Sequence, residues 1–112
     1  SDIKTFSLFN IHALTVITAI TGQNTIRFGM VEPVSKEILE NQIQTVISDF
    51  KIDGIKIGMV YNSQIIKVIY QQLKKLKIPI IVDPIIKSTT GGILLKNSAI
   101  KDFQKFIRNK SI

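Results

Sequence analysis

The spacing of hydrophobic positions changes several times along the chain, and each change predicts a different element. Residues 13–20 are apolar or β-branched at nearly every position, which is typical of a strand buried on both faces in a parallel sheet. Apolar residues recur at helical spacing in residues 35–50 and again in residues 62–76. Two short apolar runs, at residues 55–59 and 79–82, predict two further strands.

Capping residues and weaker patterns complete this outline. Ser35 and Asn62 predict the N-caps of the two long helices, because their side chains can accept a hydrogen bond from the first helical turn. Residues 2–10 predict a short helix, residues 26–31 a short edge strand, and a last helix is expected from about Ser98. Since helices and strands alternate, we expect an α/β fold with a parallel sheet and right-handed crossovers.

Composition narrows the class of protein. At 112 residues, with 45% hydrophobic and 21% charged residues, the chain resembles one soluble globular domain or part of one. It has no cysteine, which excludes disulfides, thiolate metal sites and a cysteine nucleophile. The longest nearly apolar stretch, residues 11–20, is too short to span a bilayer, and no signal peptide is visible. We therefore expect a cytoplasmic protein that does not enter a membrane.

The formal net charge of +7 raises nucleic acid and anionic small molecules as partners. Many of the basic side chains follow two predicted helices: Lys67, Lys74, Lys75 and Lys77 on one, and Lys101, Lys105, Arg108 and Lys110 on the other. Neither helix interleaves aromatic residues with the basic ones, as a stacking surface for bases requires. We expect solvated helix faces and no specific nucleic-acid partner; a basic nucleic-acid-binding domain is the alternative.

Three polar or adaptable side chains follow the predicted strands. Ligands of open α/β sheets bind beyond the carboxyl ends of the strands, so Gln23, Met59 and Asp83 would share one rim. The Gln23 amide suits a heteroaromatic ring that carries an amine beside a ring nitrogen, and Met59 can form a wall for a flat ring. Asp83 can bind a metal ion on phosphates or orient a hydroxyl. The alternatives are turn residues for Gln23 and Asp83 and a core residue for Met59.

Other features are less specific. His12 has no cysteine or second histidine with which to share a metal, so we expect a structural role. Gly91 and Gly92 would let the backbone approach an anionic group closely. The sequence contains neither the Gly-x-x-x-x-Gly-Lys-Ser/Thr phosphate loop nor the Gly-x-Gly-x-x-Gly fingerprint. Nucleotide chemistry would therefore use a different scaffold.

Four segments, taken in order, form a specific combination of motifs. They are residues 1–6 (Ser-Asp-Ile-Lys-Thr-Phe), 16–25 (Val-Ile-Thr-Ala-Ile-Thr-Gly-Gln-Asn-Thr), 52–59 (Ile-Asp-Gly-Ile-Lys-Ile-Gly-Met) and 82–86 (Val-Asp-Pro-Ile-Ile). Together they resemble the hydroxymethylpyrimidine/phosphomethylpyrimidine kinases of thiamin biosynthesis, which belong to the ribokinase-like superfamily. The similarity runs from Asp2 to about Ile107.

The resemblance implies an activity and a set of site residues. The activity is ATP- and Mg²⁺-dependent phosphorylation of hydroxymethylpyrimidine and then of its monophosphate. Asp2 and Gln23 match positions that hydrogen-bond the aminopyrimidine, Met59 and Ile85 match positions that form walls for its ring, and Asp83 matches the acidic residue near the phosphates and their metal. No residue matches the catalytic aspartate of the family.

The resemblance also implies a partial ribokinase-like fold with a mainly parallel sheet flanked by helices. Residues 1–112 would be the N-terminal half of the kinase domain, with the catalytic C-terminal half absent. We therefore expect this chain alone to be inactive and either to self-associate through exposed sheet edges or to be marginally stable.

Two departures from the family pattern leave alternatives open. Lys87 is displaced by two positions from the lysine that usually follows Asp-Pro, and Gly22 replaces the usual alanine. The alternatives are a pyridoxal or pyridoxine kinase-like protein, whose substrate is also a flat hydroxymethylated ring, and a non-catalytic remnant of the fold.

Overall fold

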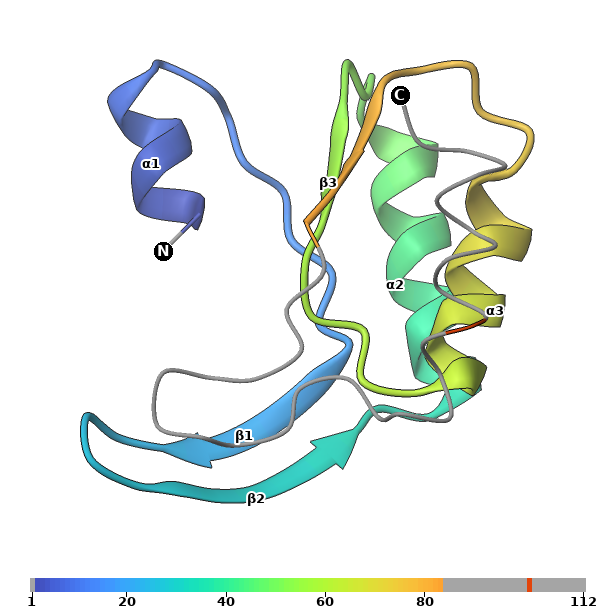
Figure 1. Ribbon diagram of the computed structural model, residues 1–112. Coiled ribbons are helices and arrows are strands. Elements are labelled where there is room, and N and C mark those ends of the chain that lie inside the picture. The colour runs from blue at the N-terminus through green and yellow to red at the C-terminus, as the bar shows by residue number, and fades with distance from the viewer. Residues whose placement is uncertain (1, 84–100, 102–112) are drawn as a thin grey trace.

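The computed structural model describes residues 2–83 and residue 101, and within them the chain is mixed α/β (Figure 1). The elements are α1 (Asp2–Leu8), β1 (Ala19–Gln23), β2 (Phe28–Pro33), α2 (Lys36–Asp49), β3 (Ile55–Ile57), α3 (Ser63–Leu73) and β4 (Ile80–Val82). The strands form two small sheets: β1 pairs antiparallel with β2, and β3 pairs parallel with β4.

The hydrophobic core lies where α2 and α3 pack beside β3 and β4 (Figure 1). Its buried residues are Leu39, Ile43, Ile57, Val60, Ile65, Ile66, Val68, Ile69, Leu73 and Ile80. Most of them belong to the helical and strand patterns expected from the sequence, so the predicted βαβ arrangement of β3, α3 and β4 is confirmed. Removal of these side chains from water is the main force that stabilises the unit.

Both predicted N-caps of the long helices are confirmed. The Ser35 Oγ accepts a hydrogen bond from the Ile38 N–H at 3.2 Å, and the Asn62 Oδ1 accepts one from the Ile65 N–H at 3.0 Å. Each cap residue has an extended backbone, so the helix begins at the next residue. The local cap signals therefore locate the starts of α2 and α3 correctly.

The prediction of a buried strand at residues 13–20 is wrong. Residues 11–18 have no regular secondary structure, and β1 begins at Ala19. The side-chain amide of Gln42, in α2, donates to the Ile17 carbonyl and accepts from the Ile17 N–H, both at 2.8 Å. Because a helix side chain satisfies these two backbone groups, Ile17 needs no neighbouring strand.

The strand that does form belongs to a hairpin. β1 pairs with β2 in the register Ala19↔Pro33 to Gln23↔Phe28, with an irregularity after Thr21. The predicted edge strand is thus present, but shifted toward the C-terminus. No residue of β1 or β2 is buried, and Figure 1 shows the hairpin extending from the end of the molecule toward which the carboxyl ends of β3 and β4 point.

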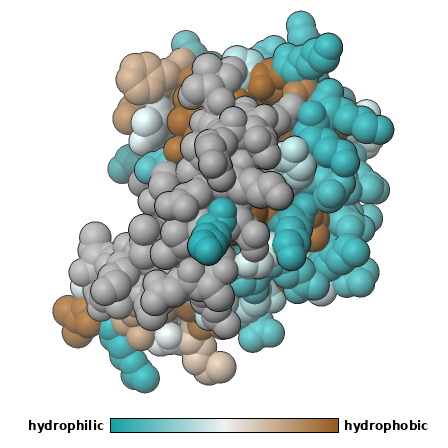
Figure 2. Space-filling view, turned by 45° about the vertical axis from the view of Figure 1, so that its right-hand side comes forward, coloured by the Kyte–Doolittle hydropathy of each residue, from teal (hydrophilic) through white to brown (hydrophobic). Residues whose placement is uncertain are grey.

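The exposed surface divides by chemistry. Lys67 on the outer face of α3 and its C-cap residue Lys74 are both exposed, as the predicted solvated helix face requires. Figure 2 shows hydrophilic side chains gathered along one side of the molecule and hydrophobic ones at the opposite edge. Large exposed apolar side chains include Leu8 of α1 and Ile26 and Met30 of the hairpin.

Some predictions fall on residues that the structure does not describe. The predicted helix from Ser98, the ring-wall residue Ile85, Lys87 and the glycine pair at 91–92 all lie there. Within the described residues, no helix is long and apolar enough to cross a membrane.

Candidate functional site

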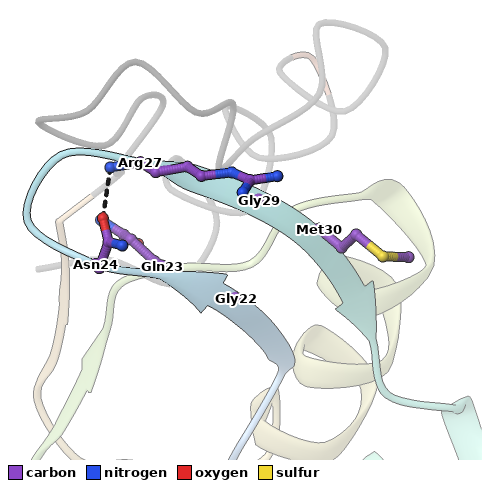
Figure 3. Close-up of a pocket in the computed structure, with 6 residues that line it drawn as sticks. All are labelled: Gly22, Gln23, Asn24, Arg27, Gly29 and Met30. Atoms are coloured by element: carbon purple, nitrogen blue, oxygen red, sulfur yellow. Dashed lines mark hydrogen bonds between the residues drawn. The ribbon is translucent and has the colours of Figure 1, made fainter.

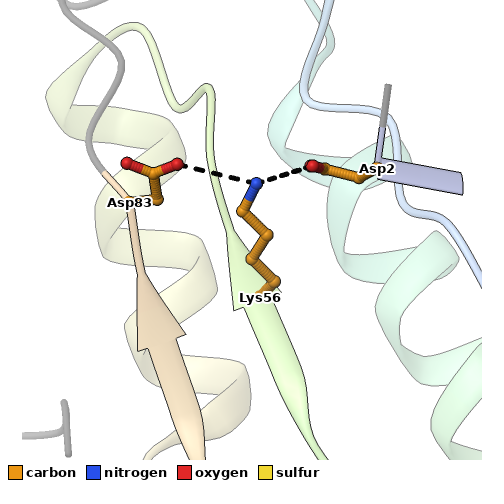
Figure 4. A network of polar contacts seen from close by, with 3 residues as sticks. All are labelled: Asp2, Lys56 and Asp83. Carbon is orange, nitrogen blue, oxygen red and sulfur yellow. Dashed lines mark hydrogen bonds and ion pairs between the residues drawn. The ribbon is translucent and has the colours of Figure 1, made fainter. Parts of the chain in front are cut away.

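A polar cluster lies at the carboxyl ends of the two parallel strands, with Lys56 at its centre (Figure 4). The Lys56 Nζ is 2.7 Å from Asp2 Oδ1 and 2.8 Å from Asp2 Oδ2, and it lies 3.7 Å from Asp83 Oδ2. Asp2 belongs to the first turn of α1, Lys56 to β3, and Asp83 follows β4 directly. The fold thus joins three segments that are far apart in the sequence.

The alternation of side chains along β3 explains where Lys56 points. Successive residues of a strand face opposite sides of the sheet. Ile55 and Ile57 face the core, and Ile57 is only 7% exposed, so the Lys56 side chain projects from the other face. Its register partner Ile81 is 63% exposed on that same face.

Backbone pairing fixes Asp83 just past the end of β4. The Asp83 N–H donates to the Ile57 carbonyl at 2.9 Å, which extends the β3–β4 ladder by one bond. The Asp83 side chain is therefore presented by a rigid element, and at 62% exposed it remains open to solvent and ligands.

One ammonium between two carboxylates sets the charge of the cluster. The hydrogen bond with Asp2 raises the pKa of Lys56; partial burial opposes this, and the charges of both aspartates add to it. Lys56 is thus protonated at neutral pH, and the three side chains together carry a net negative charge. Each aspartate keeps oxygen lone pairs that can accept from a ligand amine or hydroxyl, or bind a cation.

The donor set limits what metal chemistry this cluster can support. Residues 2–83 contain no group of three histidine, cysteine, aspartate or glutamate side chains that could hold a metal ion. Mg²⁺ bound to nucleotide phosphates commonly takes one or two protein carboxylates and fills its other positions with phosphate oxygens and water. Asp83 fits such a single-carboxylate role, because its side chain is exposed and fixed at a strand end.

Met59 connects this region with the hairpin. Its carbonyl oxygen accepts a hydrogen bond from Thr18 Oγ1 at 2.7 Å, one residue before β1 begins. The Met59 side chain is neither fully buried nor fully exposed, so it is available to form a wall for a ligand. The bond fixes the base of the hairpin beside the loop that follows β3.

The hairpin carries an open hollow of about 440 Å³, lined by Gly22, Gln23, Asn24, Arg27, Gly29 and Met30 (Figure 3). The Asn24 Oδ1 accepts from the Arg27 N–H at 2.6 Å and from the Ile26 N–H at 2.9 Å, which shapes the turn. The side chains of Gln23, Asn24 and Arg27 give this hollow a few polar groups, while most of its lining is apolar.

Glycine is required at one of the two strand positions in this hollow. A Cβ on Gly29 would lie 2.8 Å from the Gly22 carbonyl oxygen, closer than real side chains come. A Cβ on Gly22 would meet only the Met30 backbone nitrogen, at 3.9 Å, which is an ordinary contact. The alanine that usually stands at position 22 in the family would therefore fit.

The structure unites some of the predicted site residues and separates others. Lys56 brings Asp2 and Asp83 together, whereas Gln23 lines the hairpin hollow (Figures 3 and 4). Gln23 does end a strand, as expected, but that strand belongs to the other sheet, so the expected single rim is wrong.

Two residues of this region were missed in the sequence. Lys56 is a single charge inside an apolar strand, and that misplaced polarity was the signal that could have identified it. Arg27 follows the Gln-Asn-Thr turn but belongs to no motif, so no pattern distinguished it from surface charge.

Comparison with known proteins defines the class. The fold matches the crystal structure of a phosphomethylpyrimidine kinase from Clostridium difficile with a TM-score of 0.84 at 40% sequence identity. That match covers 95% of this chain and 46% of the other. The sequence profile for phosphomethylpyrimidine kinase matches residues 1–112, and the chain belongs to this kinase family.

Curated relatives agree with this assignment. The chain is 37% identical over 102 residues to the hydroxymethylpyrimidine/phosphomethylpyrimidine kinase of Aquifex aeolicus, covering 90% of this chain and 40% of that protein. It is 40% identical over 100 residues to the kinase of the same description from Rhizobium meliloti, covering 89% and 38%. The family resemblance seen in the sequence is confirmed, and the chain spans about two-fifths of the length of these relatives.

Proposed function

We propose that this chain forms the pyrimidine-binding part of a kinase that phosphorylates hydroxymethylpyrimidine and its monophosphate with ATP. The observation that carries the proposal is the cluster at the carboxyl ends of β3 and β4. There Lys56 pairs with both Asp2 and Asp83, two residues that match substrate and phosphate positions of the family. Family membership and the location of ligand sites in open α/β sheets support it.

Each residue takes a role that suits its chemistry. By their match to the family, the Asp2 carboxylate accepts from the ring amine and the Gln23 amide pairs with a ring nitrogen. Because Gln23 lies on the hairpin, apart from the cluster of Asp2, Lys56 and Asp83, both contacts to one ring require the exposed hairpin to approach the cluster when the ligand binds. Met59 would form one apolar wall for the ring, and the match to the family assigns the other wall to Ile85, which lies outside the described residues. These contacts place the hydroxymethyl group in one orientation, which lowers the entropic part of the barrier to transfer.

Asp83 serves the phosphate side of the site. Its exposed carboxylate would hold the Mg²⁺ that accompanies ATP, and that ion supplies positive charge which offsets the charge on the phosphates. Phosphoryl transfer also requires donors aimed at the transferring phosphate and a group that orients the attacking hydroxyl. Since no residue of this chain matches the catalytic aspartate of the family, we expect no conversion of ATP to ADP by the purified 112-residue chain.

Isothermal titration with hydroxymethylpyrimidine tests the binding part of the proposal. Gln23→Leu should weaken binding by about 1–3 kcal/mol, because binding withdraws the ligand's amine and ring nitrogen from water and the leucine offers them no partner. Gln71→Leu makes the same chemical change on the exposed face of α3 and should leave affinity unchanged.

Each outcome of this titration is decisive. Equal affinities for Gln23→Leu and the parent chain would remove Gln23 from the site. No binding by the parent chain would contradict the proposed function, and tighter binding of pyridoxine would favour the pyridoxine kinase-like alternative.

A further inference from the structure

Lys56 and Asp2 differ in how firmly their backbones are fixed. β3 pairs with β4, and the adjacent residue Ile57 is 7% exposed within the core. By contrast, α1 has no buried residue, and its Ile3 and Leu8 side chains are 57% and 78% exposed. β3 is therefore the fixed side of the ion pair, and Asp2 on α1 is the side that needs to be held.

We propose that Lys56 is a positioning residue of the pyrimidine site, whose ammonium group holds the Asp2 carboxylate, and with it the first turn of α1, beside the end of β4. The proposal rests on the proposed function, because the ligand that Asp2 would meet is the aminopyrimidine. Lys56 itself makes no contact with substrate in this arrangement.

The geometry of the ion pair supports this role. The Lys56 Nζ contacts both oxygens of Asp2, at 2.7 and 2.8 Å, but lies 3.7 Å from Asp83. A contact to both oxygens fixes the direction of the carboxylate as well as its position. Because each carboxylate oxygen has two lone-pair sites, the edge turned away from Lys56 remains free for a ligand amine.

Charge gives a second reason for a cation at this position. Asp2 and Asp83 both lie close to the same ammonium, and without it the two carboxylates would face each other as like charges. Repulsion would move the partner on the less rigid element, which is Asp2. A carboxylate already held in place also needs less ordering when ligand binds, which favours affinity.

A label experiment tests the positioning without reference to any ligand. The chain has no cysteine, so a nitroxide attached at Ser7→Cys, an exposed position of α1, is unique. In the parent chain the nitroxide should broaden the amide signals of β3 and β4. In Lys56→Met this broadening should fall, whereas Lys56→Arg should retain it because the cation is kept. Lys67→Met, the same change on the exposed face of α3, is the control and should behave as the parent chain.

A double-mutant cycle on hydroxymethylpyrimidine affinity tests the link to the site. Lys56→Met should weaken binding at least about tenfold, and Lys56→Arg should restore most of the loss. In an Asp2→Asn background, Lys56→Met should cause little further loss, because the lysine acts through Asp2. Fully additive losses would overturn the proposal, as would unchanged broadening in Lys56→Met.

The two experiments separate failure of the inference from failure of the function. If the parent chain does not bind the pyrimidine, the proposed function is contradicted. The label experiment then decides alone whether Lys56 positions Asp2.

Discussion

Two regions of this molecule differ in how much apolar surface they bury. The unit formed by α2, β3, α3 and β4 contributes nine of the ten buried core residues within the described part of the chain, and Val60 in the connecting loop is the tenth. The α1 helix and the β1–β2 hairpin contribute none. Yet Asp2 and Gln23, the two residues proposed to hydrogen-bond the pyrimidine, come from these exposed elements.

The comparison shows that stability and ligand recognition are divided between the regions. Burial of apolar surface stabilises the core unit, at roughly 25 cal/mol for each Å² removed from water. An isolated two-stranded hairpin is marginal in water and needs contacts from elsewhere. Here the bonds from Gln42 to Ile17 and from Thr18 to Met59 supply them.

The largest expected difference between the two regions is in the loss of stability when one isoleucine side chain is truncated in each. Ile65→Ala, at a residue 1% exposed, should lower the free energy of unfolding by about 2–5 kcal/mol, because it leaves a cavity in the core. Ile26→Ala, at a residue 87% exposed, should change it by less than about 0.5 kcal/mol. Urea denaturation followed by circular dichroism measures both, and similar losses would show that the hairpin belongs to the core.

A pair of glycine substitutions gives the next largest effect, confined to the hairpin. Gly29→Ala forces a Cβ against the Gly22 carbonyl and should weaken the local hairpin by about 1–3 kcal/mol. Gly22→Ala has room and should be neutral or slightly favourable. Amide hydrogen exchange of β1 and β2 should accelerate in Gly29→Ala alone, with α3 unchanged. Equal amide exchange rates in the two variants would mean that β1 and β2 can move apart to accommodate the Gly29 Cβ without weakening the hairpin.

The smallest expected difference in stability is between two asparagines whose side-chain oxygens each accept hydrogen bonds from nearby backbone N–H groups. Asn62→Ala removes the cap of α3 and should lower the free energy of unfolding by about 1 kcal/mol. Asn24→Ala removes two hydrogen bonds in the hairpin turn and should leave global unfolding nearly unchanged, because the hairpin can open on its own. A global loss in Asn24→Ala as large as that in Asn62→Ala would contradict the division into two regions.

Much of the core unit was predictable from the sequence, because its signals are local. Ser35 and Asn62 bond to groups three residues away, and the apolar stripes of α2 and α3 repeat every three or four residues. Such interactions hold wherever the segment sits in the fold. The family was recognisable for a similar reason, since its motifs are short continuous segments.

Only the tertiary structure decided the backbone conformation of residues 11–18 and which residues meet in the site. Gln42, whose side-chain amide hydrogen-bonds the Ile17 N–H and carbonyl, lies 25 positions after Ile17 in the sequence, and no periodicity encodes such a pairing. Lys56 and Asp2 are 54 positions apart, and their ion pair exists because β3 and α1 are brought together in space. Local spacing fixes what a segment tends to form, whereas long-range contacts decide which backbone groups and charges meet.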